Sequence, residues 1–144
     1  MADDPDVETL LALTDSDGSM LKRLLSQLSA SATYDRARIE LMLSHDATEL
    51  LVARRNGQIV GMATLVSFPL PTGLRGFVED VVTDESVRGQ GIGRVLLTAM
   101  IDIAVARGFR SLELTSRPSR ESALRLYESV GFVRRDTNVL RFTP

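Results

Sequence analysis

The sequence predicts an α/β fold in which a mixed, mostly antiparallel, twisted sheet carries helices on both faces. Short apolar runs alternate with amphipathic segments of helical spacing along the 144 residues, a pattern typical of layered α/β proteins. Asn56-Gly57 joins two apolar runs and predicts a two-residue hairpin turn. An apolar, valine-rich run at residues 77–83 leads through closely spaced glycines into a long apolar segment. This order predicts a strand, a loop and a buried helix.

The first third of the chain predicts one strand and two helices. Residues 7–13 are largely apolar, so we expect a short strand there. Leucines recur at helical spacing through residues 17–30, where Asp17 is the candidate N-cap. Residues 34–45 repeat the helical spacing, with Ile39, Met42 and Leu43 on one side. We therefore expect two amphipathic helices before the hairpin.

The rest of the chain predicts strands and helices in alternation. The hairpin covers residues 49–68, and a loop rich in proline and glycine follows it. We then expect a strand at 77–83, a buried helix at 91–108, a strand at 111–115, a helix at 119–131 and a final pair of strands at 132–135 and 138–142. The unit from 77 to 115 should be a right-handed parallel crossover. No linker or repeat divides the chain, so residues 1–144 are expected to form a single domain.

The composition excludes several classes of site. There is no cysteine and only one histidine, His45, so a disulfide framework, a thiolate nucleophile and a multi-histidine metal site are excluded. No metal is therefore expected, and His45 is interpreted as a cap or surface residue. The acidic start of the chain lacks a signal-peptide pattern, and no apolar run has the length of a membrane span. We expect a cytoplasmic protein with no membrane partner.

The charges are divided unevenly along the chain. The net charge is −2, but residues 1–87 carry 7 basic and 14 acidic side chains, whereas residues 88–144 carry 10 basic and 5 acidic ones. A polyanionic ligand would be attracted to the second part, although solvated helix faces explain many of the individual arginines equally well. Because the arginines are dispersed and no aromatic platform accompanies them, no nucleic-acid partner is expected.

Gly89, Gly91 and Gly93 alternate immediately before the long apolar helix. Glycines allow several backbone N–H groups to turn toward one point, and a helix start adds unpaired donors and partial positive charge. The loop, flanked by Arg88 and Arg94, is therefore a candidate phosphate or pyrophosphate site; the alternative is a turn that only begins a helix. It lacks the Gly-Lys-Ser/Thr of a P-loop, and Arg94 occupies the third glycine position of the dinucleotide fingerprint.

Two motifs carry a resemblance to a known family. Arg88-Gly89-Gln90-Gly91-Ile92-Gly93 fits the Arg/Gln-x-x-Gly-x-Gly/Ala signature of the GNAT family of N-acetyltransferases. Leu126-Tyr127-Glu128-x-x-Gly131-Phe132 resembles a later motif of the same family, and the resemblance runs from about residue 49 to the C-terminus. It implies a single-domain fold of the GNAT type with a splayed central strand pair. It also implies an acyltransferase that uses acetyl-CoA as co-substrate and a primary amine as acceptor.

The resemblance implies how acetyl-CoA would be bound. Its pantetheine arm would run beside the backbone of Val81, Val82 and Thr83, and its thioester would lie between the strands at 77–83 and 111–115. Arg120 stands where many members carry an asparagine that contacts the cofactor; here it would meet a phosphate or simply be solvated. The pyrophosphate would lie on the loop, whose residues are Arg88, Gly89, Gln90, Gly91, Ile92, Gly93 and Arg94.

The resemblance also suggests which residue donates a proton to the leaving thiolate. Direct attack by the amine is the simplest mechanism, because the chain has no cysteine to form an acyl-enzyme. Tyr127 matches the position of the family's tyrosine, and a phenol can protonate a thiolate. The alternative is an amphipathic core tyrosine.

Glu79 is the expected general base, acting directly or through a water molecule. Adjacent strand residues point to opposite faces, so Glu79 should share a face with Val81 and Thr83, and Asp80 should face away. The strand resembles that of the glucosamine-6-phosphate acetyltransferases of the family, where the matching acid faces the substrate. Glu113 in the next strand is the reserve candidate, and an ordinary polar strand residue is the alternative for each acid.

The sequence leaves the acceptor amine open. Substrate choice in the family resides in segments that correspond here to residues 17–45 and 69–76. The alternative functions are a catalytically silent acetyl-CoA-binding regulatory module and a nucleotide-binding domain, and a homodimer is retained as an expectation for the assembly. Acidic residues around the first segment would suit a cationic amine, although a solvated helix face explains them as well: Asp15, Asp17, Asp35, Asp46 and Glu49.

Overall fold

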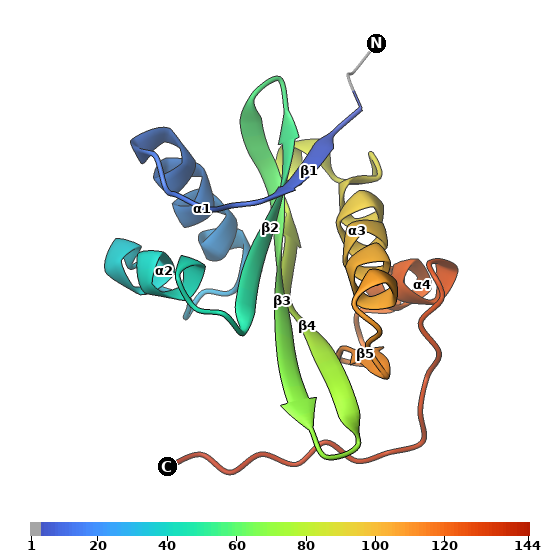
Figure 1. Ribbon diagram of the computed structural model, residues 1–144. Coiled ribbons are helices and arrows are strands. Elements are labelled where there is room, and N and C mark those ends of the chain that lie inside the picture. The colour runs from blue at the N-terminus through green and yellow to red at the C-terminus, as the bar shows by residue number, and fades with distance from the viewer. Residues whose placement is uncertain (1–3) are drawn as a thin grey trace.

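The sheet at the centre of the structure has five strands in the order β1-β2-β3-β4-β5 (Figure 1). The computed structural model describes residues 4–144. The acidic start of the chain, which shows no signal-peptide pattern, therefore lies partly outside the described residues. Among residues 4–144, no helix is both long and apolar enough to cross a membrane. The elements are β1 (Asp6–Thr9), α1 (Asp15–Leu28), α2 (Arg36–Leu43), β2 (Thr48–Arg55), β3 (Gln58–Leu70), β4 (Gly73–Thr83), the 3-10 turn η1 (Glu85–Val87), α3 (Ile92–Ala106), β5 (Ser111–Glu113) and α4 (Glu121–Ser129).

The strands confirm the predicted mixed, mostly antiparallel sheet. Neighbouring strands run antiparallel from β1 to β4, whereas β4 and β5 are parallel. The parallel pairing covers only residues 75–77 of β4 and residues 111–113 of β5. Beyond that point β4 continues to Thr83 without β5 as a neighbour. The predicted splayed strand pair is therefore present between β4 and β5.

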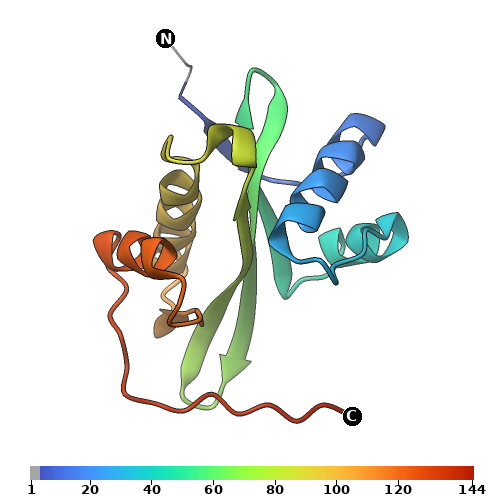
Figure 2. The same cartoon turned by 180° about the vertical axis from the view of Figure 1, so that it is seen from behind.

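Helices cover both faces of the sheet, as predicted. Figures 1 and 2 show α1 and α2 on one face and α3 and α4 on the other. Leu21 of α1 packs with Val52 of β2 in the core on the α1 side. Leu97 and Met100 of α3 pack with Leu65 of β3 in the core on the α3 side. The sheet separates the two cores. A strand residue that packs in one of these cores therefore has its side chain on the corresponding face of the sheet.

Both early helices begin at a side chain that caps the first turn. Thr14 accepts a hydrogen bond from the N–H of Asp17 at 3.1 Å, and Asp35 accepts one from the N–H of Arg38 at 3.2 Å. The predicted N-cap, Asp17, is therefore wrong by three residues. Its carboxylate instead accepts two hydrogen bonds from Arg54, each 2.9 Å long, a long-range contact that helical spacing does not reveal.

The β2–β3 hairpin turns at Asn56-Gly57, as predicted. Both residues have positive φ, 53° and 79°, which is the conformation of the favoured two-residue hairpin turn. Further along β3, a Cβ at Gly61 would lie 2.6 Å from the side chain of Ile92. Because Gly61 has no side chain, the start of α3 and the loop before it can lie close to the sheet.

The predicted final pair of strands is wrong. Residues 132–144, which follow α4, form no helix or strand and run in an extended path past the tip of the β3–β4 hairpin (Figure 1). The segments 132–135 and 138–142 have the composition of strands, but a strand also needs a neighbour to supply its backbone hydrogen bonds. Within the described part of the chain, they have no such neighbour.

Candidate active site

A cleft of about 150 Å³ lies where β4 and β5 diverge. The end of α1, β4, the segment after β5 and the helix α4 all contribute to its walls. Four residues predicted to belong to the site meet at this cleft: Glu79 and Val81 from the strand at 77–83, and Arg120 and Tyr127 from the segment at 119–131. The full lining is Leu28, Val78, Glu79, Asp80, Val81, Leu114, Thr115, Arg120 and Tyr127.

A β-bulge at Asp80 sets the direction of the side chains of β4. Thr64 and Met62 of β3 are two residues apart, but their partners on β4, Glu79 and Val82, are three apart. Asp80 adopts a φ of 52°, in the left-handed region that aspartate tolerates better than most residues. An extra residue of this kind bends a strand and changes the direction of a side chain.

The bulge overturns the alternation expected for β4. Val78 joins the core on the α3 side and Val82 the core on the α1 side, although residues four apart in a regular strand share a face. Val81 packs against the α3-side core as well. Successive side chains of a strand alternate between faces, so the side chain of Glu79, next to Val78, lies on the α1 side. Glu79 therefore does not share a face with Val81. Asp80 does not simply face away, because both acids line the cleft.

The acidic pair gives the cleft its electrostatic character. Glu79 is exposed overall, but partial desolvation in the cleft raises the pKa of its carboxyl, and the charge of the neighbouring Asp80 raises this pKa further. A carboxylate with a raised pKa is a better proton acceptor near neutral pH. Two adjacent carboxylates also attract a protonated amine. The cleft can therefore attract a cation and accept its proton.

Tyr127 belongs both to the α3-side core and to the wall of the cleft. It is 8% exposed, and its ring packs edge-to-face against Phe132 with the centroids 6.3 Å apart. Burial raises the pKa of the phenol, and the positive charge of Arg120 offsets part of this rise. Because the ordinary pKa of tyrosine is already about 10, the phenol is protonated at neutral pH and can donate its proton.

The glycine loop joins the end of β4 to α3. Gly89 and Gly91 have φ of 77° and 84°, and no atom lies within 4 Å of the place a Cβ would take at either residue. Gly91 is the N-cap of α3 and accepts a 3.1 Å hydrogen bond from the N–H of Val95. The N–H groups of residues 92–94 therefore have no partner within the helix. Unoccupied space next to unpaired backbone N–H donors suits a phosphate group.

Gly93 is required for close packing and not for a positive φ. A Cβ there would lie 3.0 Å from the side chain of Leu126 in α4. Its backbone needs no positive φ, unlike Gly89 and Gly91. Gly93 therefore allows α4, which carries Tyr127, to approach the first turn of α3.

The other polar residues of the loop motif differ in their surroundings. Arg94 donates a 2.8 Å hydrogen bond to Oγ of Ser129 and so links α3 to the end of α4. Gln90 accepts a hydrogen bond from Arg55 of β2, and Arg88 is exposed. Arg120 immediately precedes α4 and is the only cationic residue among those that line the cleft.

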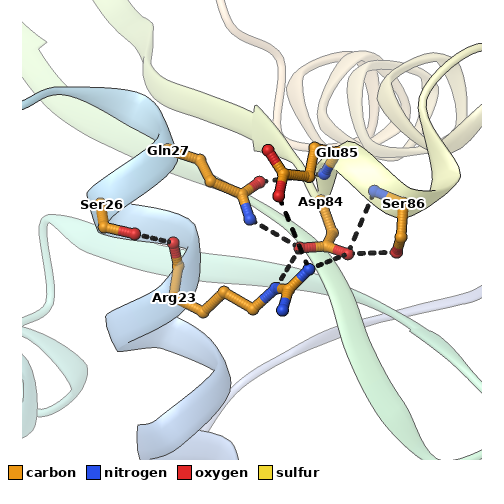
Figure 3. Close-up of polar contacts among 6 residues, drawn as sticks. All are labelled: Arg23, Ser26, Gln27, Asp84, Glu85 and Ser86. Atoms are coloured by element: carbon orange, nitrogen blue, oxygen red, sulfur yellow. Dashed lines mark hydrogen bonds and ion pairs between the residues drawn. The ribbon is translucent and has the colours of Figure 1, made fainter.

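Asp84 joins the loop to α1 (Figure 3), a role that no sequence motif predicted. It is 3% exposed. Its carboxylate accepts hydrogen bonds from Arg23 Nε at 2.7 Å, from Gln27 Nε2 at 2.8 Å and from Ser86 Oγ. Gln27 in turn accepts a 2.9 Å hydrogen bond from the N–H of Glu85. We call these five residues the Asp84 cluster.

The Asp84 cluster connects one wall of the cleft to the glycine loop. Its members Arg23 and Gln27 lie on α1, the helix that ends at the cleft residue Leu28. The hydrogen bond from Arg23 holds the pKa of Asp84 well below its usual range, so Asp84 is ionised at neutral pH. The signal available in the sequence was an aspartate two residues before a serine at the end of a strand, a pattern that favours a capped turn.

Glu113, the reserve base, lies outside the cleft lining. Its carboxylate pairs with Arg75 at 2.8 Å and with Arg135 at 3.5 Å. Both ion pairs hold the Glu113 carboxylate away from the cleft. The geometry therefore favours Glu79 over Glu113.

The acidic residues of the N-terminal segment do not gather at the cleft. Most of them pair with arginines at the protein surface or in the α1-side layer, which favours the structural interpretation over an acceptor site. The acids that do line the cleft are Glu79 and Asp80. The pairs are Asp15 with Arg36 at 2.6 Å, Asp17 with Arg54 at 2.9 Å, Asp35 with Arg38 at 3.7 Å and Glu49 with Arg107 at 2.6 Å.

A larger hollow of about 290 Å³ lies between the end of α2 and the start of β2. Two of its polar side chains pair with each other, Glu49 with Arg107, and His45 Nδ1 accepts a 3.1 Å hydrogen bond from the N–H of Ala47. This matches the interpretation of His45 as a cap or surface residue. The hollow shares no residue with the cleft, and none of the predicted catalytic or cofactor residues lines it.

Residues 19–132 match the Acetyltransferase (GNAT) family. The chain belongs to the GNAT family of acetyltransferases. The match covers the glycine loop, both strands of the splayed pair and Tyr127, and it confirms the resemblance stated from the sequence motifs.

Similar proteins carry acetyltransferase names. The chain is 35% identical to mycothiol acetyltransferase of Thermomonospora curvata over 99 residues, 69% of this chain but only 32% of that protein. It is 32% identical to N-alpha-acetyltransferase RimI of Mycobacterium tuberculosis over 140 residues, 93% of this chain and 84% of that protein. Thus the chain spans about a third of one relative and most of the other.

The solved structures support the same fold. A putative acetyltransferase from Agrobacterium tumefaciens matches with a TM-score of 0.85 and 27% identity, over 96% of this chain and 99% of that one. The likeness supports the predicted GNAT-type fold.

Proposed function

We propose that the chain transfers an acetyl group from acetyl-CoA directly to a primary amine within a ternary complex. One observation supports this most strongly: Glu79 and Tyr127 line the same cleft, beside the strand that ends in the open glycine loop. Attack of an amine on a thioester needs one group that accepts a proton and another that donates one. The cleft offers both.

Backbone groups would hold most of the acetyl-CoA. Beyond residue 77, β4 has no strand partner on its β5 side, so the backbone of Val81, Val82 and Thr83 could bond the amide groups of the pantetheine arm. The Val82 side chain is buried on the α1 side, so this residue would contribute through its backbone. The unpaired amides of residues 92–94 and the space at Gly91 suit the pyrophosphate.

The proton transfers follow from the two side chains. Glu79 would accept a proton from the amine nitrogen, directly or through water, as the new nitrogen–carbon bond forms. Tyr127 would donate its proton to sulfur as the carbon–sulfur bond breaks. No acyl-enzyme on a cysteine is available, because the chain has none. The adjacent carboxylates of Glu79 and Asp80 would also attract the amine in its protonated form.

A panel of amines tests the proposal. Acetyl-CoA is incubated with the protein and with aminosugars, polyamines, amino acids or peptides with free N-termini, and both CoA thiol and product mass are measured. We expect thiol release that depends on one class of amine, with a product heavier by one acetyl group. Acetyl-CoA binding without acetylation of any amine would instead support a silent regulatory module. Equal thermal stabilisation by NAD and acetyl-CoA would support a nucleotide-binding domain.

A further inference from the structure

The two proton-transfer residues of the cleft belong to different faces of the sheet. Tyr127 packs in the α3-side core, whereas the side chain of Glu79 lies on the α1 side, opposite to that of Val78. Under the proposed function, the sulfur of the thioester lies near the tyrosine and the amine nitrogen lies near the glutamate. The amine therefore approaches from the α1 side, and the rest of its molecule lies on that face of the sheet.

On the α1 side, the sheet is covered in one direction from Glu79 and not in the other. Val82, further along β4, is 7% exposed and packs in the same core as Leu21 and Leu24 of α1. In the opposite direction, β4 leads to the tip of the β3–β4 hairpin, which extends beyond α1 and α2 (Figures 1 and 2). The part of the acceptor beyond its amine group is therefore directed toward the hairpin tip.

Two stacked phenyl rings, Phe68 of β3 and Phe77 of β4, lie on this part of the α1-side face. Alternation from Val78 and from Leu65, which both pack in the α3-side core, places both rings on the α1 side. Their centroids are 5.3 Å apart. Both residues are partly buried, but neither belongs to the two cores of the described residues. We call Phe68 and Phe77 the phenyl pair. Residues two apart in a strand are separated by about 7 Å, so Phe77 is the next side chain on this face after Glu79.

The charged groups around the phenyl pair disfavour an acceptor that carries a phosphate. Arg75, the next residue on this face of β4, donates a 3.1 Å hydrogen bond to Ser111 Oγ and pairs with Glu113 at 2.8 Å. Its guanidinium is therefore already engaged by β5. Arg120, which lines the cleft, immediately precedes α4, and α4 lies on the other face of the sheet (Figure 2). A phosphate on the acceptor would be repelled by the two adjacent carboxylates of the cleft.

We propose that the acceptor is a primary amine that carries an aromatic or bulky apolar group close to its nitrogen. This assignment rests on the proposed acetyl transfer at the cleft and names the class of amine that takes part in it. The nitrogen lies at the carboxylates of Glu79 and Asp80, and the apolar group covers the phenyl pair. Contact between aromatic rings adds to the gain from burying apolar surface. The phenyl pair thus determines which amines are accepted.

The rates of three matched amines provide the first test. Ethylamine, 2-phenylethylamine and 2-aminoethyl phosphate share the aminoethyl group and differ in what it carries. We expect kcat/KM for 2-phenylethylamine to exceed that for ethylamine by roughly thirtyfold, since the phenyl group is removed from water. We expect 2-aminoethyl phosphate to be the slowest of the three. Equal values for ethylamine and 2-phenylethylamine, or a preference for 2-aminoethyl phosphate, would overturn the assignment and leave acetyl transfer itself intact.

Variants of the phenyl pair locate the preference on the sheet. Phe77→Ala should lower the ratio of kcat/KM for 2-phenylethylamine to that for ethylamine by roughly tenfold. Phe109→Ala is the matched control, because Phe109 packs on the opposite face of β4, where its ring lies 2.5 Å from the place of a Cβ at Gly76. The control should leave the ratio unchanged, and partial unfolding does not alter a ratio measured on one sample. Phe77→Leu nearly keeps the volume and should lower the ratio by at least about twofold through loss of the aromatic contact. An unchanged ratio in the Phe77 variants would overturn the assignment.

A binding measurement separates the assignment from catalysis. The chain has five phenylalanines, so ¹³C labelling of their rings gives few signals. The labelled protein is titrated with 2-phenylethylamine in the presence of CoA, which has no acetyl group to transfer. We expect nuclear Overhauser contacts from the ring protons of the amine to the rings of Phe68 and Phe77 and none to the ring of Phe109. Such contacts without acetylation of any amine would support the acceptor surface and reject the proposed transfer. Absence of contacts to Phe68 and Phe77 would overturn the assignment, whatever the rates.

Discussion

Glu79 owes its position to the backbone of the residue that follows it. Asp80 has a φ of 52°, a conformation that costs a non-glycine residue of order 1 kcal/mol and that recurs at functional sites. The resulting bulge brings two adjacent carboxylates to one cleft, where a regular strand would separate them. Asparagine tolerates the same conformation, so Asp80→Asn removes the charge without removing the bulge.

We expect Glu79→Gln to lower kcat/KM most strongly near neutral pH, where the amine arrives protonated and needs a base. The defect should shrink as the pH approaches the pKa of the amine. Asp80→Asn should have a smaller effect and should move the acidic limb of the profile to lower pH. Partial desolvation would still raise the pKa of Glu79, but the contribution from the Asp80 charge would be gone. Profiles of kcat/KM against pH for the three proteins measure this, and a pH-independent defect in Glu79→Gln would mean that Glu79 only positions the substrate.

Glu79→Gln, which should lower activity, should raise the stability of the folded state near neutral pH. Because the pKa of Glu79 is raised by folding, ionisation of this carboxyl destabilises the folded state at a pH above the folded-state pKa. Below the unfolded pKa of about 4.3, both states are protonated and this cost vanishes. Glu79→Gln should therefore unfold at a slightly higher temperature than the natural protein at pH 7 and at the same temperature near pH 3.5. Thermal unfolding at both values checks that the lost activity does not reflect a damaged fold.

For Tyr127, we expect Tyr127→Phe to bind acetyl-CoA normally and to lose roughly ten- to a thousandfold in kcat. The ring that fills the α3-side core and packs edge-to-face against Phe132 is kept, and only the proton donor is removed. Acetyl-CoA titration and steady-state kinetics separate the two effects. A normal kcat would assign Tyr127 to the core alone.

At the scale of elements, α3 provides an internal comparison because glycines lie at both of its ends. Gly91 and Gly108 have φ of 84° and 69°, and a Cβ at either residue would meet nothing within 4 Å. An alanine at either residue would therefore introduce a similar backbone strain. Only Gly91 adjoins the unpaired amides at the start of the helix.

We expect Gly91→Ala to weaken acetyl-CoA binding more than tenfold, which is more than about 1.4 kcal/mol. Gly108→Ala should lower the unfolding temperature by a similar amount but leave the affinity unchanged. Isothermal titration and thermal unfolding of both variants make the comparison. Equal loss of affinity in the two variants would mean that the loop acts only through the stability of α3.

The Asp84 cluster connects α1 to the loop, and its removal should depend on pH. Asp84→Asn should cost about 1–2 kcal/mol at pH 7, at the low end for charged hydrogen bonds because Arg23 is half exposed. Folding lowers the pKa of Asp84, so its contribution is complete above the unfolded pKa of about 3.9 and is lost as the pH falls toward the folded pKa. The difference in stability should therefore shrink below about pH 4. Urea unfolding at pH 7 and pH 3 measures it, and Glu85→Gln, which removes an exposed charge at the edge of the cluster, should change little.

At the scale of the whole molecule, the features that the sequence predicted are those determined by local chemistry. The turn at Asn56-Gly57 needs only residues that tolerate positive φ, and the glycine loop needs only a strand before it and an apolar helix after it. These two features could be predicted because neighbours in the chain determine them. The meeting of Glu79 with Tyr127 is a long-range contact, and it could be expected only from the family resemblance.

The remaining features depend on residues far apart in the sequence. The bulge at Asp80 arises from the pairing of β4 with β3, and nothing in the composition of β4 marks it. The hydrogen bonds that join Asp84 to α1 become visible only in the folded structure, where α1 brings Arg23 to its carboxylate. The final strands were predicted from their composition, but a strand requires a partner, and the described chain offers residues 138–142 none.

We propose above that acetyl transfer takes place in the cleft between β4 and β5, with Glu79 accepting a proton and Tyr127 donating one. The most direct measurement is the amine-dependent release of CoA thiol at saturating acetyl-CoA, for the natural protein and for Glu79→Gln combined with Tyr127→Phe. We expect the natural protein to release thiol only when the amine is present. The double variant should bind acetyl-CoA but lose the amine-dependent release. Full amine-dependent release by the double variant would place the chemistry elsewhere and contradict the proposed roles of Glu79 and Tyr127.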